Sequence, residues 1–513
     1  MSMPVVNPSS ATVLSATDAF FGGLELAIGW QTVSLMIVGV LVGIFIGSMP
    51  GIGPSIGMAV ALPLTLAFEP GTAIILLISI YSGGMYGGSI SAILLNVPGT
   101  AGAAATTFDG YPLSRQGRAM DALVISAVGS ALGGIITVIA LFLLTPFLIE
   151  IVLLFRSPDY FLIAFLGLAM ITVVARGSII KGLVAGFFGL MITTMGIAQQ
   201  TADVRYTFGQ DLLLFDGLNF IAILIGLFAI SEMIKLSGES GGISKKGTEV
   251  KGSVGAGLRV IRDNPVGLFK SAFIGLIIGS VPGAGSSVAN FVSYTEMVRS
   301  SKDGRFGQGD ERGVLASEAA NNGNVAGSLI PTLSFGIPGS GATAVLLGGL
   351  IFHGLNPGPT LFSEALDVTF SFYFALLLGN LVILIIGLTV VSRFSVLTRV
   401  DTNIIIPMIT VLAVVGSFAI RQDWVDVFTI FVIGIIGFYM VKHNYSIIAF
   451  VLGAVLGPIA ETNFIRSMNL SGNSPIIFVE RTTSFILLTL IILVLFGPFL
   501  KKQVGKLRER VDA

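Results

Sequence analysis

The stretch ALDVTFSFYFALLLGNLVILIIGLTVV, residues 365–391, contains a single charged residue, Asp367, near its start. Crossing a bilayer as a helix takes about 20 predominantly apolar residues, so this run is long enough to span. Residues 485–500 form a second such run with no charge at all. Further runs of this kind follow Gly29, Ala119, Pro158, Ser178, Asn219, Pro265, Thr402, Trp424 and Ser446. We therefore predict an all-α polytopic membrane protein with about 10–14 transmembrane segments.

The composition supports a membrane protein and excludes several other classes. Charged residues make up 11% of the 513 residues, whereas a soluble domain carries about 25%. The net charge is zero, which argues against a nucleic-acid partner. The chain has no cysteine, so disulfides and thiolate chemistry are excluded. Residues 1–18 contain no lysine or arginine, so they lack the basic start of a signal peptide.

Two stretches of the chain resemble each other. Residues 46–57 read IGSMPGIGPSIG and residues 278–289 read IGSVPGAGSSVA, with seven of the twelve positions identical. Each stretch is followed by a second Pro-Gly pair, Pro98-Gly99 in the first half and Pro338-Gly339 in the second. We infer an ancient duplication in which each half carries two Pro-Gly interruptions.

The positive charges predict how the halves are arranged across the membrane. Residues 1–236 form the first membrane half and 265–500 the second, joined by a Gly/Ser-rich linker, residues 237–264, and followed by a tail, residues 501–513. Linker and tail are basic, so we place both in the cytoplasm and the uncharged N-terminus outside. The two Pro-Gly motifs are then approached from opposite faces, which predicts inverted repeats with broken helices or re-entrant hairpins.

Paired Pro-Gly interruptions indicate where the chemistry lies. Proline and glycine break helices, and broken backbone at membrane depth is tolerated only in protein or around a watery cavity. Helix N-termini at such breaks suit an anion, and C-terminal carbonyls suit Na⁺. The predicted substrate- and ion-binding residues are Ser48, Gly51, Gly53, Ser55, Asn96, Pro98, Gly99, Thr100, Ser280, Gly283, Gly285, Ser286, Ser287, Asn290, Asn322, Pro338, Gly339 and Ser340. The alternative is that the breaks are kinks that let helices pack closely.

Few ionisable residues lie within the apolar stretches: Glu69, Asp121, Lys270, Glu296 and Glu318. Each is either functional or an anchor at the end of a span. Neither GxGxxG nor GxxxxGK[ST] occurs, so no dinucleotide or ATP site is predicted. The two histidines, His353 and His443, belong to no HExxH motif, and we expect no cofactor or zinc, only Na⁺ as a candidate coupling ion at the same residues.

The blocks around the breaks carry a family resemblance. They are GSMPGIGPSIGMAVALPLTL from Gly47, YGGSISAILLNVPGTAGAAATTFDGYPLSRQGRA from Tyr86, GSVPGAGSSVANFVSY from Gly279 and SEAANNGNVAGSLIPTLSFGIPGSGATAVLLGGL from Ser317. With these blocks the chain resembles the large permease subunit of bacterial tripartite tricarboxylate transporters, the TctA family.

The resemblance implies a multi-pass protein of the bacterial inner membrane that works with two partners. These are a small TctB-like membrane subunit and a periplasmic TctC-like solute-binding protein. It also implies uptake of citrate-like tricarboxylates or related organic carboxylates by symport with Na⁺ or H⁺. The absence of arginine beside the Pro-Gly breaks agrees with weak intrinsic affinity, for which a separate binding protein is useful.

Two other functions fit a polytopic membrane protein. A membrane-embedded enzyme acting on a lipid or lipid-linked substrate needs a convergent acid, base or metal set, which the sequence does not offer. A stand-alone channel would differ from a carrier in showing no saturation at low flux. We therefore expect a secondary transporter and not an enzyme.

Overall fold

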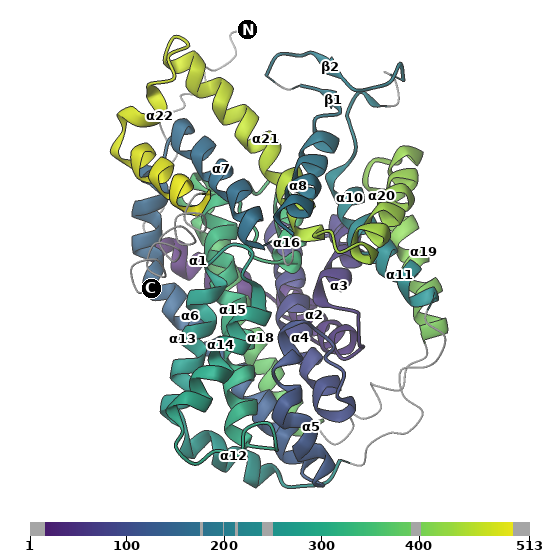
Figure 1. Cartoon of the computed structure of the whole chain (residues 1–513), viewed down its shortest axis with the longest axis vertical. Coiled ribbons are helices and arrows are strands. Elements are labelled where there is room, and N and C mark those ends of the chain that lie inside the picture. The colour runs from purple at the N-terminus through teal and green to yellow at the C-terminus, as the bar shows by residue number, and fades with distance from the viewer. Residues whose placement is uncertain are drawn as a thin grey trace, which may run out of the picture.

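The computed structural model describes residues 16–174, 178–198, 200–210, 214–238, 250–390, 402–495 of the chain, and it is almost entirely helical (Figure 1). The predicted tail, residues 501–513, and part of the predicted linker lie outside the described residues. The elements of the first half are α1 Ala16–Ile28, α2 Trp30–Gly47, α3 Pro54–Ala61, the 3₁₀ helix η1 Leu62–Ala67, α4 Pro70–Leu95, the 3₁₀ turn η2 Gly102–Ala104, α5 Thr107–Arg115, α6 Ala119–Leu154, α7 Ser157–Val174, α8 Ile179–Thr193, β1 Gly196–Ile197, β2 Val204–Arg205, α10 Phe220–Ile225, the π-helical turn η3 Gly226–Ile230 and α11 Ser231–Ser237.

The second half begins with an amphipathic helix inside the predicted linker. This helix, α12, covers Val254–Asp263 and packs on α6 of the first half. The elements that follow are α13 Pro265–Gly279, α14 Gly285–Ser300, α15 Glu311–Phe335, α16 Gly341–Phe352, α17 Pro359–Ser363, α18 Leu366–Thr389, α19 Thr402–Arg421, α20 Trp424–Lys442, α21 Ile447–Leu470, α22 Ile477–Glu480 and a last helix, Thr482–Leu495.

Eight helices in the described part of the chain are long and apolar enough to cross a membrane, and six shorter apolar helices accompany them. The protein is therefore a multi-pass membrane protein. The sequence predicted 10–14 segments because it counted apolar runs, whereas the chain breaks divide some runs into helices too short to span alone. Pro54–Ala67, Pro265–Gly279 and Gly341–Phe352 are such short helices.

The helices break where the Pro-Gly pairs predicted. Helices α2, α4, α13 and α15 end at Gly47, Leu95, Gly279 and Phe335, each before its proline. Three of the breaks turn through a glycine with positive φ, Gly51 at 84°, Gly283 at 77° and Gly336 at 67°, a conformation in which other residues are strained. The predicted broken helices are confirmed.

Helices α4 and α15 form the centre of the molecule, and each packs along the helix that precedes its half's first break. Helix α2 packs along α4, and α13 packs along α15 (Figure 1). A Cβ atom on Gly43 of α2 would lie 2.4 Å from the carbonyl oxygen of Ile80 on α4. A Cβ atom on Gly275 of α13 would lie 2.4 Å from the carbonyl oxygen of Ala320 on α15. Such contact between helix backbones requires a residue without a side chain.

These close contacts occupy equivalent positions in the two halves. Aligning the chain on Pro50 with Pro282 and on Pro98 with Pro338 pairs Gly43 with Gly275 and Ile80 with Ala320. The same alignment relates a second pair of backbone contacts, Gly87 with Ile44 and Gly327 with Leu276. The two halves therefore share a packing framework, while the inverted orientation of the repeats remains a prediction.

The two ends of the molecule differ. A short antiparallel hairpin, with Gly196 opposite Arg205, projects from one end. Helices α5 and α12 lie at the opposite end (Figure 1). Because α12 belongs to the basic linker, the second end is the one that the sequence predicts to face the cytoplasm.

Candidate substrate-binding site

The four breaks surround one cavity of about 670 Å³. Each break contributes backbone and small side chains to its wall, and helix α4 and the α20–α21 connection complete it. The lining residues are Gly51, Gly53, Pro54, Ser55, Tyr81, Met85, Pro98, Gly99, Thr100, Ala101, Gly283, Ala284, Gly285, Ser286, Ser287, Ser340, Gly341, Ala342, Val441, Asn444, Tyr445, Ser446, Ile447 and Ile448. Segments far apart in the sequence thus meet at one place.

Within each half, the two breaks contact each other. A Cβ atom on Gly99 would lie 2.0 Å from the carbonyl oxygen of Gly47, at the end of α2. In the second half, the amide of Gly283 donates to the carbonyl of Gly339, at 3.2 Å. The paired interruptions of each half therefore form a single wall.

The two walls also contact each other. The side-chain amide of Asn290 on α14 donates to the carbonyl of Gly102, at 2.6 Å. On the other side, a Cβ atom on Gly341 would lie 3.1 Å from the hydroxyl of Ser55. The four breaks therefore form a closed ring, each touching two others.

Four helix N-termini point into this ring. The first residues of α3, α14, α16 and α21 all line the cavity. The first turn of a helix has N–H groups without intrahelical partners and carries the positive end of the helix dipole. At α16 a capping box occupies the N–H groups of Ser340 and Thr343. The amides of Gly341 and Ala342 donate to no residue in the described part of the chain.

The polar side chains in the cavity are uncharged. Neither Asp, Glu, Lys nor Arg occurs among the lining residues. The hydroxyls of Ser55, Ser286 and Ser287 make no hydrogen bond with the described residues, so they are free to bond a ligand. An anion here is stabilised by dipoles and hydroxyls rather than by a fixed positive charge.

Several residues predicted for the site lie elsewhere. The hydroxyls of Ser48 and Ser280 donate to the carbonyls of Phe45 and Ile277, both at 2.7 Å. Asn96 is an exposed left-handed cap at the end of α4. The remaining residues outside the cavity lining are Asn290, Asn322, Pro338 and Gly339.

Two of these still support the wall of the cavity. Asn290 is buried beneath it and bonds both Gly102 and the Asn321 side chain. Gly339 bonds the lining residue Gly283. Asn322 is more remote, because its amide donates to Asn380 on α18, at 3.1 Å.

The sequence analysis missed Tyr81, Met85 and the α20–α21 connection. The connection, residues 441–448, includes Asn444 with a positive φ of 61° and Ser446, which caps α21. A polar segment between two apolar runs is a recognisable turn signal. Nothing in the sequence indicates that this turn lies against breaks some 100 residues or more away, however.

The ionisable residues flagged in the sequence separate into two groups. Glu69 is exposed before α4; Asp121 pairs with Arg118 at 2.8 Å, and Lys270 pairs with Glu296 at 2.5 Å. These four are anchors or ion pairs near helix ends. Of the five, only Glu318 is 0% exposed, and it has no cationic partner among the described residues.

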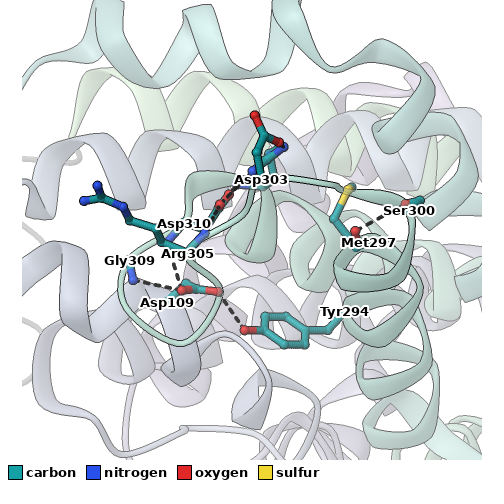
Figure 2. Close-up of polar contacts among 9 residues, drawn as sticks. Asp109, Tyr294, Met297, Ser300, Asp303, Arg305, Gly309 and Asp310 are labelled. Carbon is teal, nitrogen blue, oxygen red and sulfur yellow. Dashed lines mark hydrogen bonds and ion pairs between the residues drawn. The ribbon is translucent and has the colours of Figure 1, made fainter.

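The loop between α14 and α15 is fastened to the first half by Asp109 of α5. Figure 2 shows its carboxylate facing the loop: the amides of Gly309 and Asp310 donate to it at 2.9 Å, and the Tyr294 hydroxyl donates at 2.8 Å. Burial raises the pKa of Asp109, and these donors offset part of that rise. Burial also acts on Asp310, but hydrogen bonds from Arg312 outweigh it and hold the pKa of Asp310 below its usual range.

No group of three or more His, Cys, Asp or Glu side chains that could hold a metal ion occurs among the residues described. Broken membrane helices around a central polar cavity define a class of membrane protein, the solute transporters.

The chain belongs to the tripartite tricarboxylate transporter TctA family, whose model matches residues 33–452. It is therefore a transporter subunit and not an enzyme, and the family implies further subunits in the same transporter.

Two relatives come from Agrobacterium vitis. One is described as an uncharacterized 52.8 kDa protein in the TAR-I ttuC' 3' region and is 34% identical over 461 residues, which is 90% of this chain and 91% of the relative. The other, an uncharacterized protein in the TAR-II ttuC' 3' region, is 30% identical over 217 residues, 42% of this chain and 90% of the relative. No solved structure matches the chain.

Proposed function

We propose that the chain is the permease of a binding-protein-dependent secondary transporter that imports tricarboxylates or related organic carboxylates across the bacterial inner membrane. Its partners are a small TctB-like membrane subunit and a periplasmic TctC-like binding protein, and an ion gradient of Na⁺ or H⁺ drives uptake. The observation that carries the proposal is the cavity at which four helix N-termini meet around uncharged hydroxyls.

The nature of the cavity explains why several subunits are useful. Helix dipoles and hydroxyls bind anions more weakly than a bidentate arginine does. A cavity without fixed positive charge therefore releases its solute readily but captures it poorly at low concentration. A separate binding protein supplies the capture, and a co-transported cation offsets the charge of the solute.

The two related halves also support alternating access. Transporters with inverted repeats expose a central site to each side in turn by moving one part against another. We propose an elevator-like motion. In it, the break-containing helices move past α19, α20 and the end of the molecule that carries the β1–β2 hairpin.

Uptake of citrate by membrane vesicles containing the three subunits tests this function. The Ser287→Ala/Asn290→Ala variant is expected to lose uptake, and Ser286→Ala/Ser287→Ala isolates the hydroxyls without disturbing the Asn290 bonds. Ser280→Ala is the matched control, because its hydroxyl bonds the backbone outside the cavity. Normal uptake by both double variants at equal membrane abundance would exclude this site.

Imposing Na⁺ and H⁺ gradients separately on the same vesicles identifies the driving ion. Saturation of uptake at low flux distinguishes a carrier from a channel. Solutes captured by the binding protein can replace citrate once they are known.

A further inference from the structure

The carboxylate of Glu318 lies in a buried cluster of hydroxyl groups. Glu318 is on α15 and is 0% exposed. Its Oε1 accepts hydrogen bonds from Ser89 on α4, at 2.6 Å, and from Thr106 before α5. Its Oε2 accepts hydrogen bonds from Ser126 and Ser130 of α6, at 3.1 and 2.8 Å. Three segments of the first half thus enclose one acidic side chain of the second.

This cluster contains no compensating positive charge. None of the ion pairs in the described part of the chain includes Glu318. Removing a carboxylate without a cationic partner from water is unfavourable even after the protein relaxes. A bound cation, including a proton, would remove that cost.

The four partners suit a proton in particular. A hydroxyl donates to a carboxylate, and after rotation it accepts from a protonated carboxyl group. Thr106 also lies 2.8 Å from the hydroxyl of Ser317, which gives the displaced O–H of Thr106 a second acceptor. The cluster can therefore satisfy Glu318 in both protonation states without moving a backbone segment.

The other titratable groups on the surrounding helices interact with Glu318 or with partners of their own. Tyr86 on α4 interacts electrostatically with Glu318. Asp109 on α5 and Tyr294 on α14 bond each other. On the remaining helices, Asp121 of α6 and Glu311 of α15 share Arg118, Lys270 of α13 pairs with Glu296 of α14, and Arg312 of α15 pairs with Asp310.

The cluster is joined to the cavity by a short structural path. Thr106 follows the turn η2, and the residues just before η2, Pro98 to Ala101, line the cavity. One helical turn after Glu318, Asn321 bonds Asn290, whose amide holds Gly102. A change in the bonding of Thr106 therefore acts directly on one wall of the ring.

The shared framework does not require an acid at this position. In the alignment of the halves, the equivalent of Glu318 is Ile78 on α4, which is fully buried. An apolar residue thus fits the same packing position, so the carboxylate serves some other purpose than packing.

We propose that Glu318 is the site at which this permease binds and releases the proton that drives uptake. The proposal rests on the proposed function and names the coupling ion and its residue. The step is one of proton binding only: the carboxylate gains H⁺ from the side of higher proton concentration and releases it to the other side.

A substrate-independent test uses infrared spectroscopy of the purified permease complex across a pH series. The carbonyl stretch of a protonated carboxyl group is expected in the wild-type protein and lost in Glu318→Gln. Glu69→Gln, the same change at an exposed site, is expected to retain the band. A band that is identical in all three proteins would overturn the proposal.

Ser126→Ala/Ser130→Ala provides a second variant that keeps the acid and removes two donors to its anion. Its band is expected to appear at higher pH than in the wild type, because the ionised form has lost two hydrogen bonds. An unchanged titration would show that the band belongs to another group and would count against Glu318.

Transport in proteoliposomes gives the functional arm. With citrate as the probe and the partner subunits present, Glu318→Gln is expected to lose accumulation driven by a pH gradient while keeping citrate exchange. Accumulation equal to the wild type would overturn the proposal, as would wild-type uptake that follows a Na⁺ gradient and ignores pH. If the wild type does not carry citrate, the proposed substrate fails, and the infrared result still decides the role of Glu318.

Discussion

The two halves of the molecule share a framework and differ in their chemistry. Equivalent glycines bring α2 onto α4 and α13 onto α15 at equivalent positions. Where the first half has Met58 and Ile78, however, the second half has Asn290 and Glu318. All four side chains are buried. The difference teaches that the two halves share breaks and close helix contacts, while these two framework positions are apolar in the first half and polar in the second.

The largest expected effect comes from the shared framework. Gly87→Ala and Gly327→Ala place a methyl group 2.4 Å and 2.3 Å, respectively, from a carbonyl oxygen of the neighbouring helix. The helices must separate, and overpacking of this kind costs about 3 kcal/mol. Thermal unfolding in detergent is expected to show a lower melting temperature for both variants, by similar amounts.

Gly71→Ala is the control for this pair, because the nearest atom to its new methyl group is 3.6 Å away. If only one half were sensitive to the substitution, the two frameworks would not be equivalent in energy.

The difference between the halves at Met58 and Asn290 is tested by exchanging these two residue types. Asn290→Met deprives the Gly102 carbonyl and the Asn321 side chain of their donor, at a cost of about 1–3 kcal/mol. Met58→Asn places an amide in an apolar cluster, at a cost of about 1–3 kcal/mol as well. Only Asn290→Met is expected to lower citrate uptake per folded molecule, because only Asn290 joins two walls of the cavity. Equal loss of uptake in both variants would show that Asn290 has no special role in joining the two walls.

The loop between α14 and α15 is longer than its counterpart in the first half, and Tyr294→Phe tests its attachment. The variant removes the hydroxyl that donates to Asp109, and a hydrogen bond to a charged group contributes about 1.5–3 kcal/mol. The bond stabilises the ionised carboxylate, so the loss of stability is present at pH values where Asp109 is ionised. The loss of stability becomes smaller as the pH falls through the raised pKa of Asp109.

Melting temperatures across a pH series measure this effect. Tyr111→Phe on α5 makes the same change at a half-buried residue and controls for loss of a hydroxyl in general. A pH-independent difference for Tyr294→Phe would rule out Asp109 as the partner that matters.

The smallest effects are expected from the two equivalent serines in the cavity. Ser55→Ala and Ser287→Ala each remove one free hydroxyl, and a neutral hydrogen bond to the solute is worth about 0.5–1.5 kcal/mol, or about two- to tenfold in uptake. Initial rates of citrate uptake compare the two variants with Ser280→Ala. A large effect at Ser287 and none at Ser55 would show that the solute is bound by the second half alone.

The breaks and the short polar residues beside them that line the cavity could be predicted from the sequence because their cause is local. Proline disfavours the interior of a helix, although Pro331 lies within α15. Gly51 and Gly283 adopt conformations that other residues avoid. Duplication made this local signal visible twice. The hydroxyls of Ser48 and Ser280 also bond locally, to carbonyls of their own helices. The sequence does not show whether a serine bonds its own backbone or a ligand.

The remainder could not be predicted because it depends on tertiary packing. The donors to Glu318 come from residues 89, 106, 126 and 130, and no spacing in the sequence relates them to position 318. The α20–α21 connection reaches the cavity through the packing of α21 against α7 and α8. The number of spans stays a prediction, because length alone does not show where an apolar run is divided.

The neutral wall of the cavity has a practical consequence. In the function that we propose, recognition there relies on peptide dipoles and not on a guanidinium placed for one carboxylate, so the permease is expected to impose little geometry on its solute. With the partners that we propose, exchanging the binding protein for one of another specificity is expected to redirect the transporter, with Tyr81 and Met85 as the positions at which to adjust the size of the cavity.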